Sequence, residues 1–292
     1  MQLNAIAGLP RSGSTLLCNI LNQNDKFYAS TTSSLCNAFN SMIIEMSNSI
    51  EFKSLLNNNR EGTEERFKNS VKSFSDSWYS HLEKDIVFDK SRGWIHNIEI
   101  LQSLYDKSKM IVIIRDLRNI FASIEKQNRK TPLFRENQNP LERTIYKRAD
   151  EMFSPQGLIG HCIVGIEDIL NKNMSSIAIK SVHDIDGSMK IIKNKKILFI
   201  KYEQLADAPK LFMKLIYSFL EQEEFEHDFN NIKNTSEDPD GFYLYKFPHK
   251  GEGQITDNFR EEWKKFMSPG IAQLIVERFK WYYEYFGYPF GQ

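Results

Sequence analysis

Residues 8–15 read Gly-Leu-Pro-Arg-Ser-Gly-Ser-Thr. The spacing of Gly8, Gly13 and Thr15 is that of the phosphate-binding loop (P-loop) G-x-x-x-x-G-K-[ST], with Ser14 in place of the lysine. Nucleoside triphosphatases use that lysine on the β- and γ-phosphates. The segment therefore predicts a loop that holds a nucleotide phosphate without transferring it. A Gly/Ser-rich turn without chemical meaning is the alternative.

The flanking sequence supplies the context that such a loop needs. Residues 3–7 are apolar enough to predict a buried strand, and residues 14–21 predict a helix. Backbone N–H groups between a strand and a helix, with the positive end of the helix dipole behind them, form a cradle for an anion.

The rest of the chain alternates between short apolar runs and helical patterns. Further strands are predicted at residues 86–88, 110–114 and 197–200. Helices are predicted at residues 64–82, 117–126, 209–220 and 269–286. Because the runs are continuous rather than alternating, they indicate parallel strands that are covered on both faces. The predicted fold class is α/β, with a central, mainly parallel sheet and helices on both faces.

The composition limits the partners of the protein. Lys plus Arg and Asp plus Glu both number 38, so the formal net charge is +0 and no global field favours nucleic acid or an anionic membrane. We expect a single domain over residues 1–292, because no linker rich in Pro, Gly or Ser divides the chain. Cys18, Cys36 and Cys162 lack disulfide or metal spacing and are expected to be buried free thiols.

Two further features bear on location and packing. No apolar run approaches the ~18 residues of a membrane span, and a strand beginning at about residue 3 leaves no room for a signal peptide. These features predict a soluble, cytoplasmic protein. The aromatic run at residues 281–286 predicts core or interface packing, with stacking on a ligand as the alternative.

A second anchor for phosphate follows the predicted strand at residues 110–114. Arg115 comes directly after it, and Ser123 lies eight residues further on, two turns into the next helix. Ligands of α/β folds bind at such strand ends, so the two side chains can converge on one phosphate. A structural Arg/Asp salt bridge at this strand end is the alternative.

Together these segments resemble the sulfotransferases that use 3′-phosphoadenosine 5′-phosphosulfate (PAPS), most closely the tyrosylprotein sulfotransferase-like branch. Residues 10–15 match the family loop P-R-S-G-[ST]-T, and Arg115 with Ser123 match its R-x7-S element. The resemblance implies a P-loop-containing sulfotransferase-like fold. It further implies that Arg115 and Ser123 hold the 3′-phosphate. The 5′-phosphosulfate would be held by Arg11, Ser12, Gly13, Ser14 and Thr15.

Three further positions extend the resemblance. Lys90 stands where the family has a lysine at a strand end, and Tyr202 lies in Lys-Tyr-Glu-Gln-Leu, which matches the family element x-Y-E-x-L. Lys250-Gly251 with Trp263-Lys264 is a looser match to a K-G loop and a W-K pair. By this resemblance, Tyr202 and Lys250 are further donor contacts.

The implied activity is transfer of a sulfuryl group from PAPS to an acceptor hydroxyl or amine by in-line displacement. The product is adenosine 3′,5′-bisphosphate (PAP). Arg11 and Lys90 are the expected catalytic residues, because they can stabilise charge on the leaving oxygen. No acidic cage for a metal is evident, so we expect no Mg²⁺ dependence.

The general base of the family is missing. The tyrosylprotein branch has a glutamate at the position of Thr32, and cytosolic members have a histidine at the position of Arg92. His96 and Glu45 are substitutes by proximity in sequence only. The run at residues 30–34 lines the acceptor pocket or caps the following helix.

The acceptor is not predicted: a small molecule, glycan, lipid or peptide remains open, as does the oligomeric state. Two other functions remain as alternatives. One is a P-loop small-molecule kinase that uses ATP with Mg²⁺, which Ser14 argues against. The other is a catalytically inactive, PAP-binding interaction protein, which the missing base favours.

Overall fold

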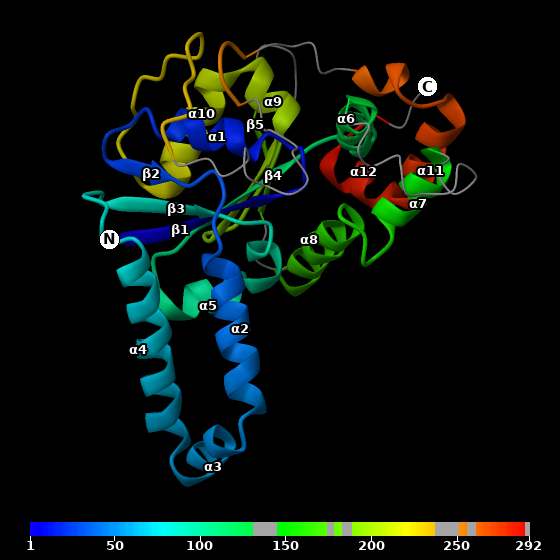
Figure 1. Ribbon diagram of the computed structural model, residues 1–292. Coiled ribbons are helices and arrows are strands. Elements are labelled where there is room, and N and C mark those ends of the chain that lie inside the picture. Colours follow the sequence, from blue (N-terminus) through cyan, green and yellow to red (C-terminus); the bar gives the residue numbers. More distant parts are fainter. Residues whose placement is uncertain (131–144, 174–177, 183–188, 237–250, 256–260, 290–292) are drawn as a thin grey trace.

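The computed structural model describes residues 1–130, 145–173, 178–182, 189–236, 251–255 and 261–289 (Figure 1). Its centre is a seven-stranded sheet in the order β2-β3-β1-β4-β7-β6-β5. The strands are β1 (Gln2–Gly8), β2 (Phe27–Ala29), β3 (Ile86–Lys90), β4 (Met110–Ile114), β5 (Ala178–Val182), β6 (Met189–Lys193) and β7 (Ile197–Lys201). The four strands predicted from apolar runs are β1, β3, β4 and β7, and they are confirmed.

The sheet is mainly parallel, as predicted. β1 pairs in parallel with β3 and β4, β2 with β3, and β7 with β4. At one edge, β6 runs antiparallel to both β7 and β5. The sequence did not reveal β2, β5 or β6. β2 is only three residues long, and the β5 and β6 segments interrupt their apolar residues with lysine and serine.

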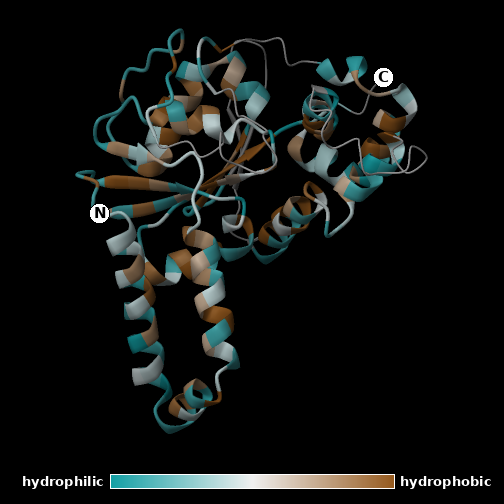
Figure 2. Ribbon diagram, viewed as in Figure 1, coloured by the Kyte–Doolittle hydropathy of each residue, from teal (hydrophilic) through white to brown (hydrophobic). Residues whose placement is uncertain are grey.

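Both faces of the sheet are covered, which explains the continuous apolar runs. In β4, Ile111 and Ile113 join one core cluster, while Met110, Val112 and Ile114 join another on the opposite face. Figure 1 shows α1, α9 and α10 on one side of the sheet and α2, α4, α5 and α8 on the other. The central strands are largely hydrophobic in Figure 2. Successive residues of a strand point to opposite faces, so a strand buried on both sides reads as an unbroken apolar run.

The helices follow the strands closely. They are α1 (Ser14–Leu21), α2 (Leu35–Asn48), α3 (Ile50–Asn58), α4 (Arg60–Trp78), α5 (Trp94–Leu104), α6 (Leu117–Lys130), α7 (Ile145–Phe153), α8 (Gly160–Asn173), α9 (Tyr202–Asp207), α10 (Pro209–Leu220), the 3-10 helix η4 (Glu262–Lys265), α11 (Pro269–Arg278) and α12 (Lys280–Phe286). The predicted helix over residues 269–286 is broken at Phe279 into α11 and α12. None of the described helices is both long and apolar enough to cross a membrane.

The helices α2, α3 and α4 project away from the sheet (Figure 1). The sequence predicted a helix over residues 64–82, whereas α4 covers residues 60–78, and its apolar side chains are only partly buried. Val71 lies in the core, whereas Phe74 and Trp78 are exposed and pack on each other with ring centroids 5.8 Å apart. These two residues therefore lie on a face of α4 that the core does not cover.

The three cysteines are buried free thiols, as expected. Burial raises the pKa of Cys18 and of Cys36 to about 12. Both thiols are therefore protonated and weakly nucleophilic at neutral pH.

Gly8 ends β1 at a point where no side chain fits. Its φ is +155°, and a Cβ there would lie 2.3 Å from the backbone oxygen of Ile113. Glycine thus allows β1 to lie directly against β4 as the chain turns into the loop.

We expect Gly8→Ala to lower the free energy of unfolding by more than about 2 kcal/mol, since backbone strain and overpacking each cost about 1–3 kcal/mol. Gly270→Ala is the matched control, because a Cβ there meets nothing within 4 Å. That substitution should be neutral or slightly stabilising in the first turn of α11. Urea unfolding of both variants checks the prediction, and equal stabilities would contradict it.

Candidate functional site

A hollow opens where β1 and β4 end. Its lining residues come from the loop after β1, the start of α1, the end of β4, α6, α9 and the segment at Gly251. They are Arg11, Gly13, Ser14, Thr15, Leu16, Arg115, Ser123, Tyr202 and Gly251. The structure therefore brings together all the predicted site residues except Ser12, Lys90 and Lys250.

The loop presents backbone N–H groups to this hollow. Gly13 caps α1 with φ +92°, and a Cβ there would lie 2.3 Å from Cδ2 of Tyr202. Arg11 also has a left-handed backbone, with φ +59°. The N–H groups of the first helical turn, residues 14–16, have no partner within the helix and carry its positive partial charge. This arrangement suits an anion.

Ser12 supports the loop from within. Its side chain is fully buried, and its hydroxyl donates to the carbonyl oxygen of Leu9 at 2.6 Å. The Ser12 side chain is therefore committed to the fold of the loop. It is absent from the lining of the hollow, although the sequence grouped it with the ligand contacts.

Arg115 extends into the hollow from the end of β4. Its Nη1 donates to the carbonyl oxygen of Arg11 at 3.0 Å, and its guanidinium lies 4.6 Å from the ring centroid of Tyr202. Within the described residues, its buried Nε has no hydrogen-bond partner. Since an unpaired buried donor is costly, this atom is suited to an incoming anion.

The two predicted phosphate sites are joined directly. Nε of Arg11 donates to the hydroxyl of Ser123 at 3.2 Å, which connects the loop to α6. The ion pair at this strand end joins Asp116 to Arg118, with 2.6 Å between Oδ2 and Nη2. The salt bridge considered from the sequence is present, but it leaves Arg115 facing the hollow.

Lys90 ends β3 beside the start of α1. Its Nζ donates to the Thr15 hydroxyl at 3.2 Å and to the Thr31 carbonyl at 2.5 Å. The lysine is not part of the lining itself, but Thr15 is, so the ammonium group lies next to the loop end of the hollow.

Asp89, the residue before Lys90 in β3, binds side chains from three other segments of the chain. This fully buried carboxylate accepts hydrogen bonds from the Ser33 hydroxyl, the Tyr79 hydroxyl at 2.5 Å and Nε1 of Trp94 at 2.7 Å. Burial raises the pKa of Asp89, and the three donors counteract that rise. Ser33 belongs to the segment whose Thr31 carbonyl receives Lys90, so Asp89 helps to fix the position of the lysine. No pattern in the sequence indicated this role.

The structure describes only part of the motif formed by Lys250-Gly251 and Trp263-Lys264. Lys250 lies outside the described residues. Its neighbour Gly251 packs on the start of α1 and accepts a hydrogen bond from Nδ2 of Asn19 at 2.8 Å. Trp263 is buried against α6, where its backbone N–H donates to Oδ1 of Asn119 at 3.2 Å.

The candidate bases from the sequence do not line the hollow. The ring of His96 stacks on His161 of α8 with centroids 4.1 Å apart, and burial together with His161 lowers the pKa of His96. Glu45 is exposed near the end of α2. Thr32 is half-buried and Arg92 is exposed. In the part of the chain that is described, no cluster of three or more His, Cys, Asp or Glu side chains could hold a metal ion.

The chain is similar to known sulfotransferase domains in sequence and in fold. Residues 5–286 match the family model described as sulfotransferase domain. The fold is similar to the sulfotransferase domain from the curacin biosynthetic pathway, with a TM-score of 0.53 and 12% identity over 96% of this chain and 98% of that chain. It is also similar to the sulfotransferase domain from the Synechococcus PCC 7002 olefin synthase, with a TM-score of 0.50 and 19% identity over 96% and 94%. No curated protein matches in sequence.

The Asp89 cluster yields a stability prediction. We expect Tyr79→Phe to lower the free energy of unfolding by about 1.5–3 kcal/mol at pH 8, as expected for a lost hydrogen bond to a charged group. The ionised Asp89 carboxylate depends more on the Tyr79 donor than the protonated carboxyl does. Because the pKa of folded Asp89 is raised, more of it is protonated at pH 5, and the loss of unfolding free energy should be smaller there.

Urea unfolding at pH 5 and pH 8 measures this difference. Tyr105→Phe is the matched control, because the Tyr105 hydroxyl donates at 2.7 Å to Asp76, whose side chain is 44% exposed. An equal loss in the two variants, or a larger loss for Tyr79→Phe at pH 5, would contradict the role assigned to Asp89.

Proposed function

Because this chain belongs to the sulfotransferase domain family, we propose that it transfers a sulfuryl group from PAPS to a hydroxyl or amine and releases PAP. We further propose that residues 1–292 act as one domain. The observation that carries the proposal is the shared lining of the hollow, in which the loop residues meet Arg115 and Ser123. A donor with phosphate at both the 5′ and the 3′ position needs two phosphate sites, whereas ADP and ATP have no 3′-phosphate.

The residues present fit such a donor. At the loop end, the N–H groups of residues 14–16 suit the 5′-phosphosulfate. At the other end, the hydroxyl of Ser123 and the Nε of Arg115, which has no partner among the described residues, suit the 3′-phosphate. Tyr202 supports this assignment, because its ring lies against the Arg115 guanidinium. Lys250 remains a proposed contact on sequence grounds.

The proposed chemistry is a displacement at sulfur. The acceptor atom forms a bond to sulfur while the bond from sulfur to the bridging oxygen of the 5′-phosphate breaks. Lys90 and Arg11 neutralise the charge that grows on this oxygen. Two positions support this role: Arg11 lines the hollow, and Lys90 donates to Thr15, which also lines it. Since these two side chains supply positive charge, we propose that turnover needs no divalent cation and continues in EDTA.

One observation favours a second candidate function. The base positions of the two family branches hold Thr32 and Arg92, neither of which can take a proton from an acceptor at neutral pH. A PAP-binding protein without turnover is therefore the alternative. The kinase alternative is disfavoured, because Ser14 replaces the lysine that contacts the β- and γ-phosphates.

Nucleotide binding tests the donor site. We expect PAP to bind more tightly than ADP or ATP with Mg²⁺. We expect Arg115→Ala to weaken PAP by about 10- to 200-fold, from a charge-assisted hydrogen bond of about 1.5–3 kcal/mol. ADP should change little. Isothermal titration calorimetry measures the constants, with Arg60→Ala on the projecting arm as the control. Equal binding of PAP and ADP by the unaltered protein would refute the proposal, and a preference for ATP with Mg²⁺ would favour the kinase.

Turnover tests the catalytic assignment. With PAPS and a panel of phenol, sugar, long-chain alcohol and tyrosine-peptide acceptors, Lys90→Ala should lose about 10²–10³-fold in kcat. Its affinity for PAP should change by less than about threefold, because Lys90 acts on charge that develops during transfer. The control is Lys84→Ala, at a half-buried lysine before β3 whose ammonium group donates to the Asp25 carbonyl at 2.7 Å. Absence of PAP release with every acceptor, in a protein that binds PAP tightly, would favour the inactive alternative.

A further inference from the structure

The aromatic run near the C-terminus lies directly behind Arg115. Tyr282 and Tyr283 of α12 are fully buried, as the prediction of core packing requires. Both also carry hydroxyl groups, which need partners when buried. Burial raises the pKa of both tyrosines, so the hydroxyls remain protonated donors.

These donors contact the turn that carries Arg115. The hydroxyl of Tyr282 donates to the carbonyl oxygen of Arg115 at 3.0 Å. The hydroxyl of Tyr283 donates to Oδ1 of Asp116, also at 3.0 Å. Asp116 is in turn paired with Arg118, whose guanidinium lies over the rings of Trp263 and Tyr283.

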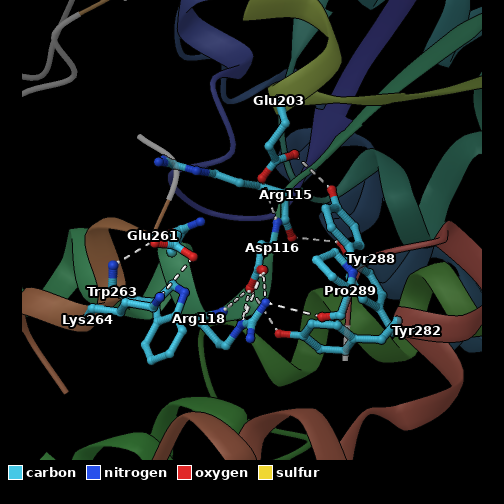
Figure 3. A network of polar contacts seen from close by, with 12 residues as sticks. Arg115, Asp116, Arg118, Glu203, Glu261, Trp263, Lys264, Tyr282, Tyr288 and Pro289 are labelled. Atoms are coloured by element: carbon cyan, nitrogen blue, oxygen red, sulfur yellow. Dashed lines mark hydrogen bonds and ion pairs between the residues drawn. The ribbon is translucent and has the colours of Figure 1, made fainter. Parts of the chain in front are cut away.

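The peptide group between Arg115 and Asp116 is held from both sides. Its carbonyl accepts from Tyr282, and its N–H donates to Oε1 of Glu203 at 3.0 Å. Glu203 is held by the Tyr288 hydroxyl, which donates to Oε2 at 3.0 Å. Figure 3 shows the Arg115 side chain extending away from these tyrosines. The backbone of Arg115 is therefore fixed on one side of the turn, while its guanidinium faces the hollow on the other.

We propose that Tyr282, together with Tyr288 through Glu203, positions Arg115 and so sets the preference for nucleotides with a 3′-phosphate. The inference rests on the proposed function. Locking the peptide plane limits rotation about the Arg115 Cα–C bond, and the Tyr202 ring fixes the guanidinium at the far end of the side chain. A preorganised cation binds an anion without the entropy cost of ordering a long side chain. Tyr282 and Tyr288 are thus positioning residues, and neither of them lines the hollow.

The test is Tyr282→Phe, which removes one oxygen and leaves the packing intact. We expect its Kd for PAP to rise about 3- to 10-fold, as expected for loss of one hydrogen bond. Its Kd for ADP should change by less than about twofold, because ADP makes no use of the 3′-phosphate site. Isothermal titration calorimetry of the two nucleotides gives the ratio, which a uniform loss of stability would not change.

Tyr217→Phe is the matched control. Tyr217 is equally buried in the core on the opposite face of the sheet, where its hydroxyl accepts from Nδ2 of Asn24 at 3.0 Å. This variant also loses a buried hydrogen bond, but it should leave the ratio of the PAP and ADP constants unchanged. If Tyr282→Phe does not fold, Tyr288→Phe removes the support of Glu203, and its PAP-to-ADP ratio should shift in the same direction.

A double variant locates the effect at Arg115. In an Arg115→Ala background the hydrogen bond from Tyr282 to the backbone carbonyl can still form, but the side chain that it positions is gone. Tyr282→Phe should then leave PAP binding unchanged, so the two substitutions are non-additive. Additive effects would overturn the inference.

The outcomes separate the two proposals. If the unaltered protein does not prefer PAP to ADP, the proposed function and this inference fail together. If it prefers PAP and Tyr282→Phe weakens both nucleotides equally or neither, the inference alone is overturned. A selective loss of PAP binding that disappears in the Arg115→Ala background supports it.

Discussion

The parallel pairing of β1 with β4 places the loop and Arg115 at the same edge of the sheet. Gly8 pairs with Ile113, so the two strands end side by side, and the chain leaves them as the loop and as Arg115. The N–H of Leu9 donates to the Ile113 carbonyl at 3.2 Å, and Arg115 donates to the carbonyl of Arg11 across the same edge. Two segments more than a hundred residues apart thus form one anion site. Without this register, the loop and the arginine would be separate features of the surface.

The two carboxylates nearest to Arg115 in the described structure do not form an ion pair with its guanidinium. Two carboxylates lie close to Arg115, but each is engaged elsewhere: Asp116 with Arg118, and Glu203 with the Asp116 N–H and Tyr288. The Arg115 guanidinium rests on the Tyr202 ring, which stabilises a cation without neutralising it. The pair Tyr202-Glu203 therefore contacts the guanidinium of Arg115 and the N–H of the peptide group that follows it. This dual role gives a physical reason for an adjacent tyrosine and glutamate at this position.

Much of the proposed donor site could be predicted from the sequence, because the patterns that indicate it lie within short segments. The strand at residues 110–114 is an unbroken apolar run, and the glycine spacing of the loop expresses the backbone conformations that the turn requires. Contacts between distant segments left no such signal. Tyr282 was expected to pack in the core, but its bond to Arg115 spans 167 residues. Asp89 was likewise missed, because its three donors come from separate parts of the fold and only the tertiary structure brings them together.

The segment at residues 30–34 and the surroundings of Lys90 give little information about the acceptor. The segment at residues 30–34 is anchored through Ser33 to Asp89 and through the Thr31 carbonyl to Lys90, so it is well fixed although it carries no acidic side chain. Asp89 is the carboxylate bonded to this segment, yet it is fully buried and accepts three hydrogen bonds. It therefore anchors the segment and cannot reach an acceptor. The donor groups lie on strand ends and helix starts that the sheet must build in any case, whereas nothing in the sheet requires a base beside Lys90. The proposed donor site therefore follows from the fold, whereas the proposed acceptor chemistry depends on side chains that the fold leaves free to vary.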